Sequence, residues 1–181
     1  MIARDDALKL LRATVDNEHL VTHMLAVEAV MRALARRFGE DEDLWGLTGL
    51  LHDLDLGELG EDLTRHGERT AEMLDGQLPP EALQAIRVHP YGVGRETKLD
   101  RALYFADPIT GLITAGVLIR PSKSLLDMTV KSLKKKFKDK RFAAGANREQ
   151  IQACSELGLE LGDFMGLALD AMREIHEDLG L

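Results

Sequence analysis

The sequence predicts an all-α protein. Aromatic side chains make up only 4% of the 181 residues and β-branched residues form few runs, which favours helices over strands. Apolar residues recur at helical spacing along most of the chain, and no segment has the alternating pattern of a convincing strand. The length suits one globular core without an internal linker, so we expect residues 1–181 to form a single domain.

The first part of the chain divides into helices with recognisable ends. We expect a short helix from Arg4 to about Val15 and a longer one from Glu18 to Phe38. Gly39 closes the longer helix, because glycine readily adopts the left-handed conformation that follows a helix end. Asp41 or Asp43 can cap the helix that comes next.

That next helix delivers the run Leu50-Leu51-His52-Asp53-Leu54-Asp55 near its end. Gly57 and Gly60 then predict an exposed turn, after which a helix restarts around His66. A short helix begins at Pro79-Pro80 and ends at His89, since proline at position 90 disfavours helical geometry at the residue before it.

The following helix begins at a predicted cap made of Thr97 and Asp100 and leads to Asp107-Pro108. Proline lacks the backbone N–H that a helix interior needs. The sequence therefore leaves two alternatives at this point: the helix bends, or Asp107 caps a new helix that begins at Pro108. In both cases Asp107 lies at a geometric break.

The last third of the chain carries a concentrated positive charge. Residues 131–141 hold seven of the 23 basic residues, although the net charge of −8 argues against a general binder of nucleic acid or membrane surfaces. Such a segment is ordinarily a solvated helix face, but it could attract an anionic small molecule or RNA. Asn147 with Gln150 predicts a capping box, and an amphipathic helix from Leu161 to Leu179 could support a homodimer.

The single cysteine, Cys154, cannot form an intramolecular disulfide, and its neighbours give no sign of activation. The first residues are acidic rather than those of a signal peptide, and no run approaches the roughly 20 apolar residues of a membrane span. We therefore expect a cytoplasmic protein with no membrane partner.

The main functional signal is His52 next to Asp53 inside an apolar run. Both are strong ligands for a divalent metal, and both are costly to bury without a partner. The chain offers four further ligands, each on a separate element or at a helix end: His23, His66, His89 and Asp107. One histidine alone is more often a hydrogen-bonded structural residue, and we assign His19 and His176 to that class.

The set of ligands resembles the HD-domain metal-dependent phosphohydrolase superfamily. Its pattern is a histidine on an early helix, an adjacent His-Asp pair and a distant aspartate, here His23, His52-Asp53 and Asp107. The resemblance covers about residues 18–120 and leaves 121–181 as a basic, helical extension. His66 and His89 match two more histidines of the binuclear branch, and the chain looks most like small bacterial HD-domain proteins of that type.

The resemblance implies a helical bundle around a buried metal centre. One divalent metal would be held by His23, His52, Asp53 and Asp107, and a second by Asp53, His66 and His89. The sequence leaves open whether one or two metals bind, and the resemblance favours iron or manganese, while zinc, cobalt and nickel also suit mixed histidine and carboxylate ligation. The implied activity is hydrolysis of a phosphate ester or anhydride, most naturally in a nucleotide, by metal-activated water.

Other site residues follow less directly from the pattern. Besides Asp53, the carboxylates of Asp55 and Glu58 could orient a ligand or move a proton, although carboxylates on exposed turns are common. Arg95 and Lys98 follow a glycine-containing loop and could bind phosphate. Two other functions stay open: a nucleotide-sensing or RNA-associated binding module with a structural metal, and diiron oxygen chemistry.

Overall fold

The computed structural model describes residues 1–59 and 63–181, and every regular element within these residues is a helix. In chain order the α-helices are α1 (Arg4–Thr14), α2 (Glu18–Phe38), α3 (Glu42–Leu51), α4 (Leu56–Leu59), α5 (Glu68–Met73), α6 (Pro80–Val88), α7 (Lys98–Leu118), α8 (Val130–Lys138), α9 (Arg148–Gln152), α10 (Leu161–Glu174) and α11 (His176–Leu179). Short 3₁₀ segments span Leu63–Arg65, Leu125–Asp127 and Ala153–Leu157. The prediction of an all-α fold is confirmed.

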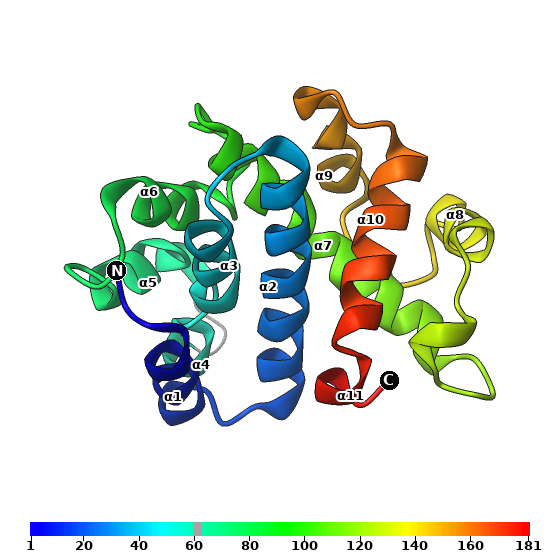
Figure 1. The fold of residues 1–181 in the computed structure, drawn as a ribbon, viewed down its shortest axis with the longest axis horizontal. Helices are drawn as coiled ribbons and strands as arrows, with labels where there is room; N and C mark the ends of the chain where they lie inside the picture. The colour runs from blue at the N-terminus through cyan, green and yellow to red at the C-terminus, as the bar shows by residue number, and fades with distance from the viewer. Residues whose placement is uncertain (60–62) are drawn as a thin grey trace.

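Helix α2 stands at the centre of the molecule, with the shorter helices α1 and α3–α6 on one side of it and α8–α10 on the other (Figure 1). It packs against α3, α7 and α10. Its bounds are those predicted, because the side chain of Asn17 accepts the backbone N–H of His19 and Gly39 adopts a φ of 69°. Buried residues such as Val27, Met31 and Leu34 make α2 the spine on which the other helices are placed.

Helix α7 lies across α2 and runs through Pro108 without interruption. The alternative of a new helix that begins at Pro108 is therefore wrong. Proline removes one backbone donor, but the buried side chains of Phe105, Ile109 and Ile113 keep both parts of the helix on the core. The predicted cap at its start is confirmed as a capping box between Thr97 and Asp100.

Two other expectations differ from the structure. The predicted helix from Leu161 to Leu179 is broken at Ile175, which has a φ of −118° and a ψ of 23° between α10 and α11. No proline or glycine marks this break, so the local sequence did not signal it. The turn predicted at Gly57 is the one-turn helix α4, and Gly60, which was assigned to the same turn, lies outside the described residues.

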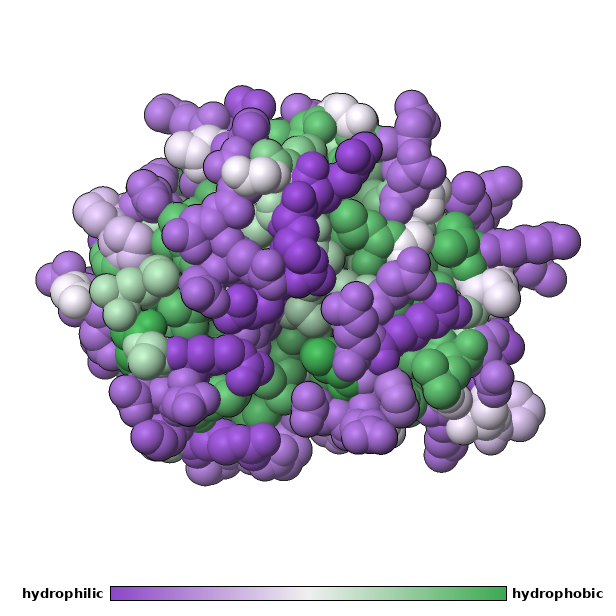
Figure 2. Space-filling model, in the orientation of Figure 1, coloured by the Kyte–Doolittle hydropathy of each residue, from purple (hydrophilic) through white to green (hydrophobic). Residues whose placement is uncertain are grey.

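The face shown in Figure 2 is mostly hydrophilic, with apolar residues in scattered groups between polar side chains. Helix α8 illustrates the pattern: Leu133 and Phe137 are buried, whereas Lys131, Lys134 and Lys138 are exposed. Among the described residues, no helix combines the length and the apolar character needed to cross a membrane.

Candidate metal centre

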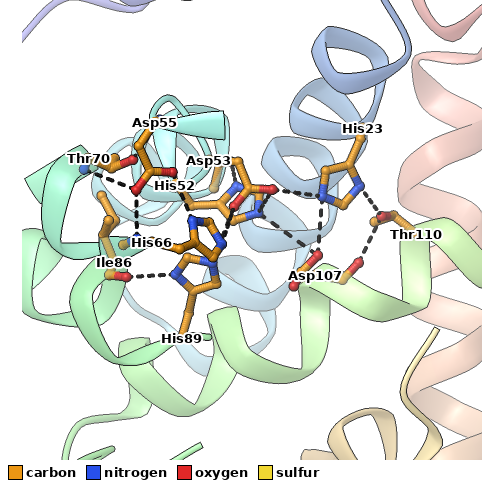
Figure 3. A network of polar contacts seen from close by, with 12 residues as sticks. His23, His52, Asp53, Asp55, His66, Thr70, Ile86, His89, Asp107 and Thr110 are labelled. Atoms are coloured by element: carbon orange, nitrogen blue, oxygen red, sulfur yellow. Dashed lines mark hydrogen bonds and ion pairs between the residues drawn. The ribbon is translucent and has the colours of Figure 1, made fainter. Parts of the chain in front are cut away.

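The six side chains predicted as metal ligands lie together between α2, α3, α6 and α7 (Figure 3). Long helices provide His23 from α2 and Asp107 from the middle of α7. The other four ligands lie at or beyond helix ends: His52 and Asp53 after α3, His66 before α5, and His89 after α6. Residues up to 84 positions apart in the sequence thus converge on one site.

Asp53 occupies the middle of the cluster, and its two carboxylate oxygens face different pairs of histidines. Its Oδ2 lies 3.6 Å from Nε2 of His23 and 3.3 Å from Nε2 of His52. Its Oδ1 lies 3.4 Å from Nε2 of His66 and 3.3 Å from Nε2 of His89. A carboxylate with this placement can serve two cations at once.

Asp107 completes the first of these two sets. Its Oδ1 lies 3.2 Å from Nε2 of His23 and 3.9 Å from Nε2 of His52. Metal bonds to histidine nitrogen and carboxylate oxygen are about 2.0–2.2 Å long, so neighbouring ligand atoms around one ion lie roughly 3–3.5 Å apart. Most of the distances in the cluster fall in this range.

The other ring nitrogen of each histidine is held by a hydrogen bond on the side away from Asp53. The Nδ1 partners are Oγ1 of Thr110 for His23 at 3.0 Å, the carbonyl of Gly49 for His52 at 2.8 Å, Oδ1 of Asp55 for His66 at 2.8 Å, and the carbonyl of Ile86 for His89 at 2.6 Å. Carbonyl and carboxylate oxygens only accept, so the proton sits on Nδ1. The Thr110 hydroxyl donates to the carbonyl of Asp107 and is therefore the acceptor for His23. All four Nε2 atoms are left free to bind a metal.

Two buried atoms show that a cation fits these residues. Nε2 of His52 and Oδ1 of Asp53 are buried and have no hydrogen-bond partner. Buried polar atoms without partners are rare, because they lose water without a replacement. A divalent ion bound between the ligands would satisfy both atoms, and the mixed nitrogen and oxygen donors suit iron, manganese, zinc, cobalt or nickel.

Electrostatics in the cluster favour ionised carboxylates. Burial disfavours the charged form of His52, but Asp53 and Asp107 outweigh it and raise the pKa of His52 to about 9. Burial likewise works against ionisation of Asp53 and Asp107, yet the neighbouring histidines keep the pKa of both carboxyls below the usual value. In the absence of a metal, His52 therefore holds a proton that metal binding must displace.

Asp55 is fully buried, so the reading that it is an exposed turn carboxylate is wrong. Its carboxylate accepts Nδ1–H of His66 at 2.8 Å and the backbone N–H groups of Gly67 at 2.7 Å and Thr70 at 3.3 Å. Burial raises the pKa of Asp55, but these donors outweigh burial and lower it overall. Asp55 lies behind His66 rather than among the Nε2 atoms, a position that orients the imidazole.

The turn that carries His66 also needs a glycine. Gly67 has a φ of 80°, and a Cβ atom there would lie 2.6 Å from the carbonyl oxygen of Ile86. A side chain would push α6, which His89 directly follows, away from this turn. The close approach thus brings the two histidines that face Oδ1 of Asp53 together.

The structure does not bring Glu58 or Lys98 to the cluster. Glu58 is exposed and its Oε2 accepts hydrogen bonds from Arg69 at 3.1 and 3.2 Å. The ammonium group of Lys98 donates to Glu40 at 2.7 Å. Lys98 begins α7 nine residues before Asp107, about 13 Å away along the helix axis. Both side chains are thus engaged by other partners, and the catalytic role of Glu58 and the phosphate-binding role of Lys98 stay predictions.

Arg95 is likewise engaged elsewhere. Its guanidinium stacks 3.7 Å from the ring centroid of Tyr104 and donates to the carbonyl of Gly92 at 3.1 Å and to Glu156 at 3.3 Å. Within the described residues no hydrogen bond or ion pair joins Arg95 to the metal ligands. Its contacts fix the loop that precedes α7.

Two threonines were missed by sequence reasoning. Thr110 holds His23, and Thr70 accepts the backbone N–H of Asp55 at 3.0 Å. Thr110 follows Asp107 by three residues on α7, a spacing that could have indicated a shared face. Thr70 carried no such signal, because its role depends on a contact with a residue 15 positions earlier. The carbonyl groups that hold His52 and His89 are local by contrast, each three residues before its histidine.

A comparison with models of protein families gave a match, and it includes all of the candidate metal ligands. A family model described as HD domain matches residues 20–112, slightly more than half of the chain. All six candidate ligands lie within the match, and α8–α11 lie outside it. Searches of curated proteins and of solved structures gave no match.

Proposed function

Because the chain belongs to the HD-domain family, whose members are generally metal-dependent hydrolases, we propose that it is a phosphohydrolase acting on a phosphate ester or anhydride, with a nucleotide as substrate. The observation that carries the proposal is the placement of Asp53, whose two oxygens face two separate pairs of Nε2 atoms. This arrangement supports two metals rather than one. The mixed donor set suits several divalent metals, and the family resemblance favours iron or manganese among them.

The residues of the cluster have two roles: some would hold the metals and others orient the histidines. His23, His52, Asp53 and Asp107 would hold the first metal, and Asp53, His66 and His89 the second. When bound, such metals lower the pKa of water toward about 7 and neutralise charge on the phosphoryl oxygens. Asp55 and Thr110 keep their imidazoles in the orientation that presents Nε2 to the site.

Metal content and turnover test this proposal together. Protein purified without added metal or chelator is analysed for metals and assayed with phosphate monoesters, nucleotides and dinucleoside polyphosphates. We expect about two equivalents of iron or manganese and release of phosphate or of a nucleotide. One equivalent would contradict the assignment of His66 and His89 as ligands. No metal uptake on reconstitution would contradict the proposal, and dioxygen consumption would indicate diiron oxygen chemistry instead.

The charge on α8 favours a second candidate, a nucleotide-sensing or RNA-associated binding module with a structural metal. Lys131, Lys134, Lys135 and Lys138 line a surface cavity of about 470 Å³. No ion pair joins these four lysines to an acidic residue among the residues the structure describes. Replacing Lys134 and Lys135 with glutamine separates the two functions, because a binding module should lose its ligand while a hydrolase of a small substrate should keep its turnover.

A further inference from the structure

A cavity of about 360 Å³ opens beside His23 and Asp107, two of the residues that would hold the first metal. It is lined by His23, Asp107, Pro108 and Gly111 from α2 and α7, and by Ala143, Gly145 and Ala146 from the loop between α8 and α9. The side chains of His23 and Asp107 are 24% and 28% exposed, more than any other ligand of the centre. A substrate that reaches the metals from this side therefore passes through the cavity.

Gly111 has no packing reason to be a glycine. It lies inside α7, where glycine is less favourable than alanine, four residues after Asp107 and therefore on the same face. A Cβ atom at Gly46, Gly49 or Gly116 would lie 2.6–2.9 Å from a neighbouring side chain, whereas at Gly111 it would meet nothing within 4 Å. The space that a side chain at position 111 would fill is the cavity itself.

The opposite wall of the cavity is a fixed loop, residues 139–147. Arg148 donates hydrogen bonds to several of its carbonyl groups, with the two at 2.6 Å made to Ala143 and Ala146. Ala143 has a φ of 44°, which is uncommon for a residue with a side chain, and the bonds from Arg148 hold it there. A Cβ atom at Gly145 would also meet nothing within 4 Å. The loop lies outside the family match and adds a wall from the C-terminal part of the chain.

We propose that this cavity holds the organic group of a phosphate ester whose phosphate lies at His23 and Asp107, and that Gly111 and Gly145 set the size of the group that fits. The proposal rests on the phosphohydrolase function proposed above. The volume lies near the lower end of the roughly 300–1,000 Å³ of small-molecule sites. Apart from His23 and Asp107, the described lining consists of small, uncharged residues. The cavity therefore suits one compact, uncharged group such as a nucleoside, and not a second nucleotide.

The kinetic test compares the wild type with Gly111→Leu, Gly145→Leu and the control Gly166→Ala. Gly166 is another helical glycine with room for a Cβ atom, whose nearest neighbour would be Val130 at 3.8 Å. For adenosine 5′-monophosphate, both leucine variants should raise KM about tenfold or more, the effect of excess volume in a small pocket. For methyl phosphate, whose methyl group is far smaller than a nucleoside, the rise in KM should be much smaller than for adenosine 5′-monophosphate. Gly166→Ala should leave KM and kcat/KM unchanged for both substrates.

A binding test does not depend on turnover. Adenosine carries no phosphate, and its binding to metal-loaded protein is measured by calorimetry, with metal content and melting temperature determined on the same samples. The wild type and Gly166→Ala should bind adenosine, and both leucine variants should bind it about tenfold more weakly, with metal content and melting temperature retained.

The two proposals fail in different ways. A wild type that binds adenosine but hydrolyses no ester contradicts the phosphohydrolase function, and weaker adenosine binding by the leucine variants still supports the cavity assignment. Equal behaviour of Gly111→Leu and Gly166→Ala toward adenosine and its monophosphate overturns that assignment, as does a wild type that does not bind adenosine.

Discussion

The two halves of the metal centre are held in place in different ways. In the first half, His23 and Asp107 stand on α2 and α7, two helices of 21 residues each that pack against one another. In the second half, His66 and His89 flank the short helices α5 and α6. The first pair is partly exposed at the cavity, whereas His89 is buried.

This difference shows which forces place each ligand. Long helices with buried apolar faces fix the backbone beneath His23 and Asp107, and one hydroxyl, from Thr110, orients the imidazole. The second half depends on the buried carboxylate of Asp55, which joins His66 to the start of α5. We therefore expect the first half to tolerate the loss of a hydrogen bond better than the second half.

The largest effect is expected at Asp53, which both halves share. Asp53→Ala removes an oxygen ligand from each metal, so both metals should be lost and turnover should fall below detection. Elemental analysis and a phosphate-release assay measure this, with the exposed Asp75→Ala as the matched control. Retention of one metal equivalent would show that the halves are independent and that Asp53 does not bridge them.

Asp55→Ala should damage the second half alone. The affinity for the second metal should fall about 10–100-fold, as is typical when the partner of a ligating histidine is removed. The free energy of unfolding of the metal-free protein should drop by about 1–3 kcal/mol, because the N–H groups of Gly67 and Thr70 lose their acceptor. Stepwise metal titration and urea unfolding measure the two effects. A loss of the first metal instead would contradict the division into halves.

Metal-free protein should lose stability at both ends of the pH scale, and each half should contribute to both losses. The pKa of His66 is raised like that of His52, and the pKa of Asp107 is lowered like that of Asp55. The pKa of His52 is raised from 6.5 to about 9, so its pairing with Asp53 and Asp107 stabilises the fold fully below pH 6.5 and is lost as the pH rises through about 9. The pKa of Asp55 is lowered, so its contribution is present above its usual pKa of 3.8 and is lost as the pH falls further. Melting temperatures across this range measure both effects. Metal-loaded protein, in which His52 is deprotonated, should lack the alkaline decrease.

The smallest effect is expected for Thr110→Val, which removes the acceptor of His23 Nδ1–H but keeps the shape of the side chain. The affinity for the first metal should fall less than it does for the second metal in Asp55→Ala, and the free energy of unfolding should change by about 1 kcal/mol. Calorimetric titration compares the two variants directly. If Thr110→Val lowered the affinity for the first metal as much as Asp55→Ala lowers that for the second, the two halves would not differ in how they are held.

The sequence by itself determined the helical class, many helix ends and the residues that form the cluster. Helix ends follow from local chemistry, as at Gly39 and at the capping box of Thr97 and Asp100, which needs only neighbouring residues. The cluster was predictable because adjacent His52 and Asp53 in an apolar run require partners, and the resemblance to the HD-domain superfamily indicated which other histidines and which aspartate supply them.

Only the tertiary structure decided how those residues are supported and reached. The burial of Asp55 depends on contacts 11 to 15 positions away, and Thr110 meets His23 across 87 positions. Glu58, Arg95 and Lys98 were plausible from sequence proximity, yet each is paired elsewhere. The cavity at Gly111 exists because a loop from outside the family match faces α7 across it. Local sequence fixes local backbone geometry, but only the packing of distant segments decides which side chains share a site.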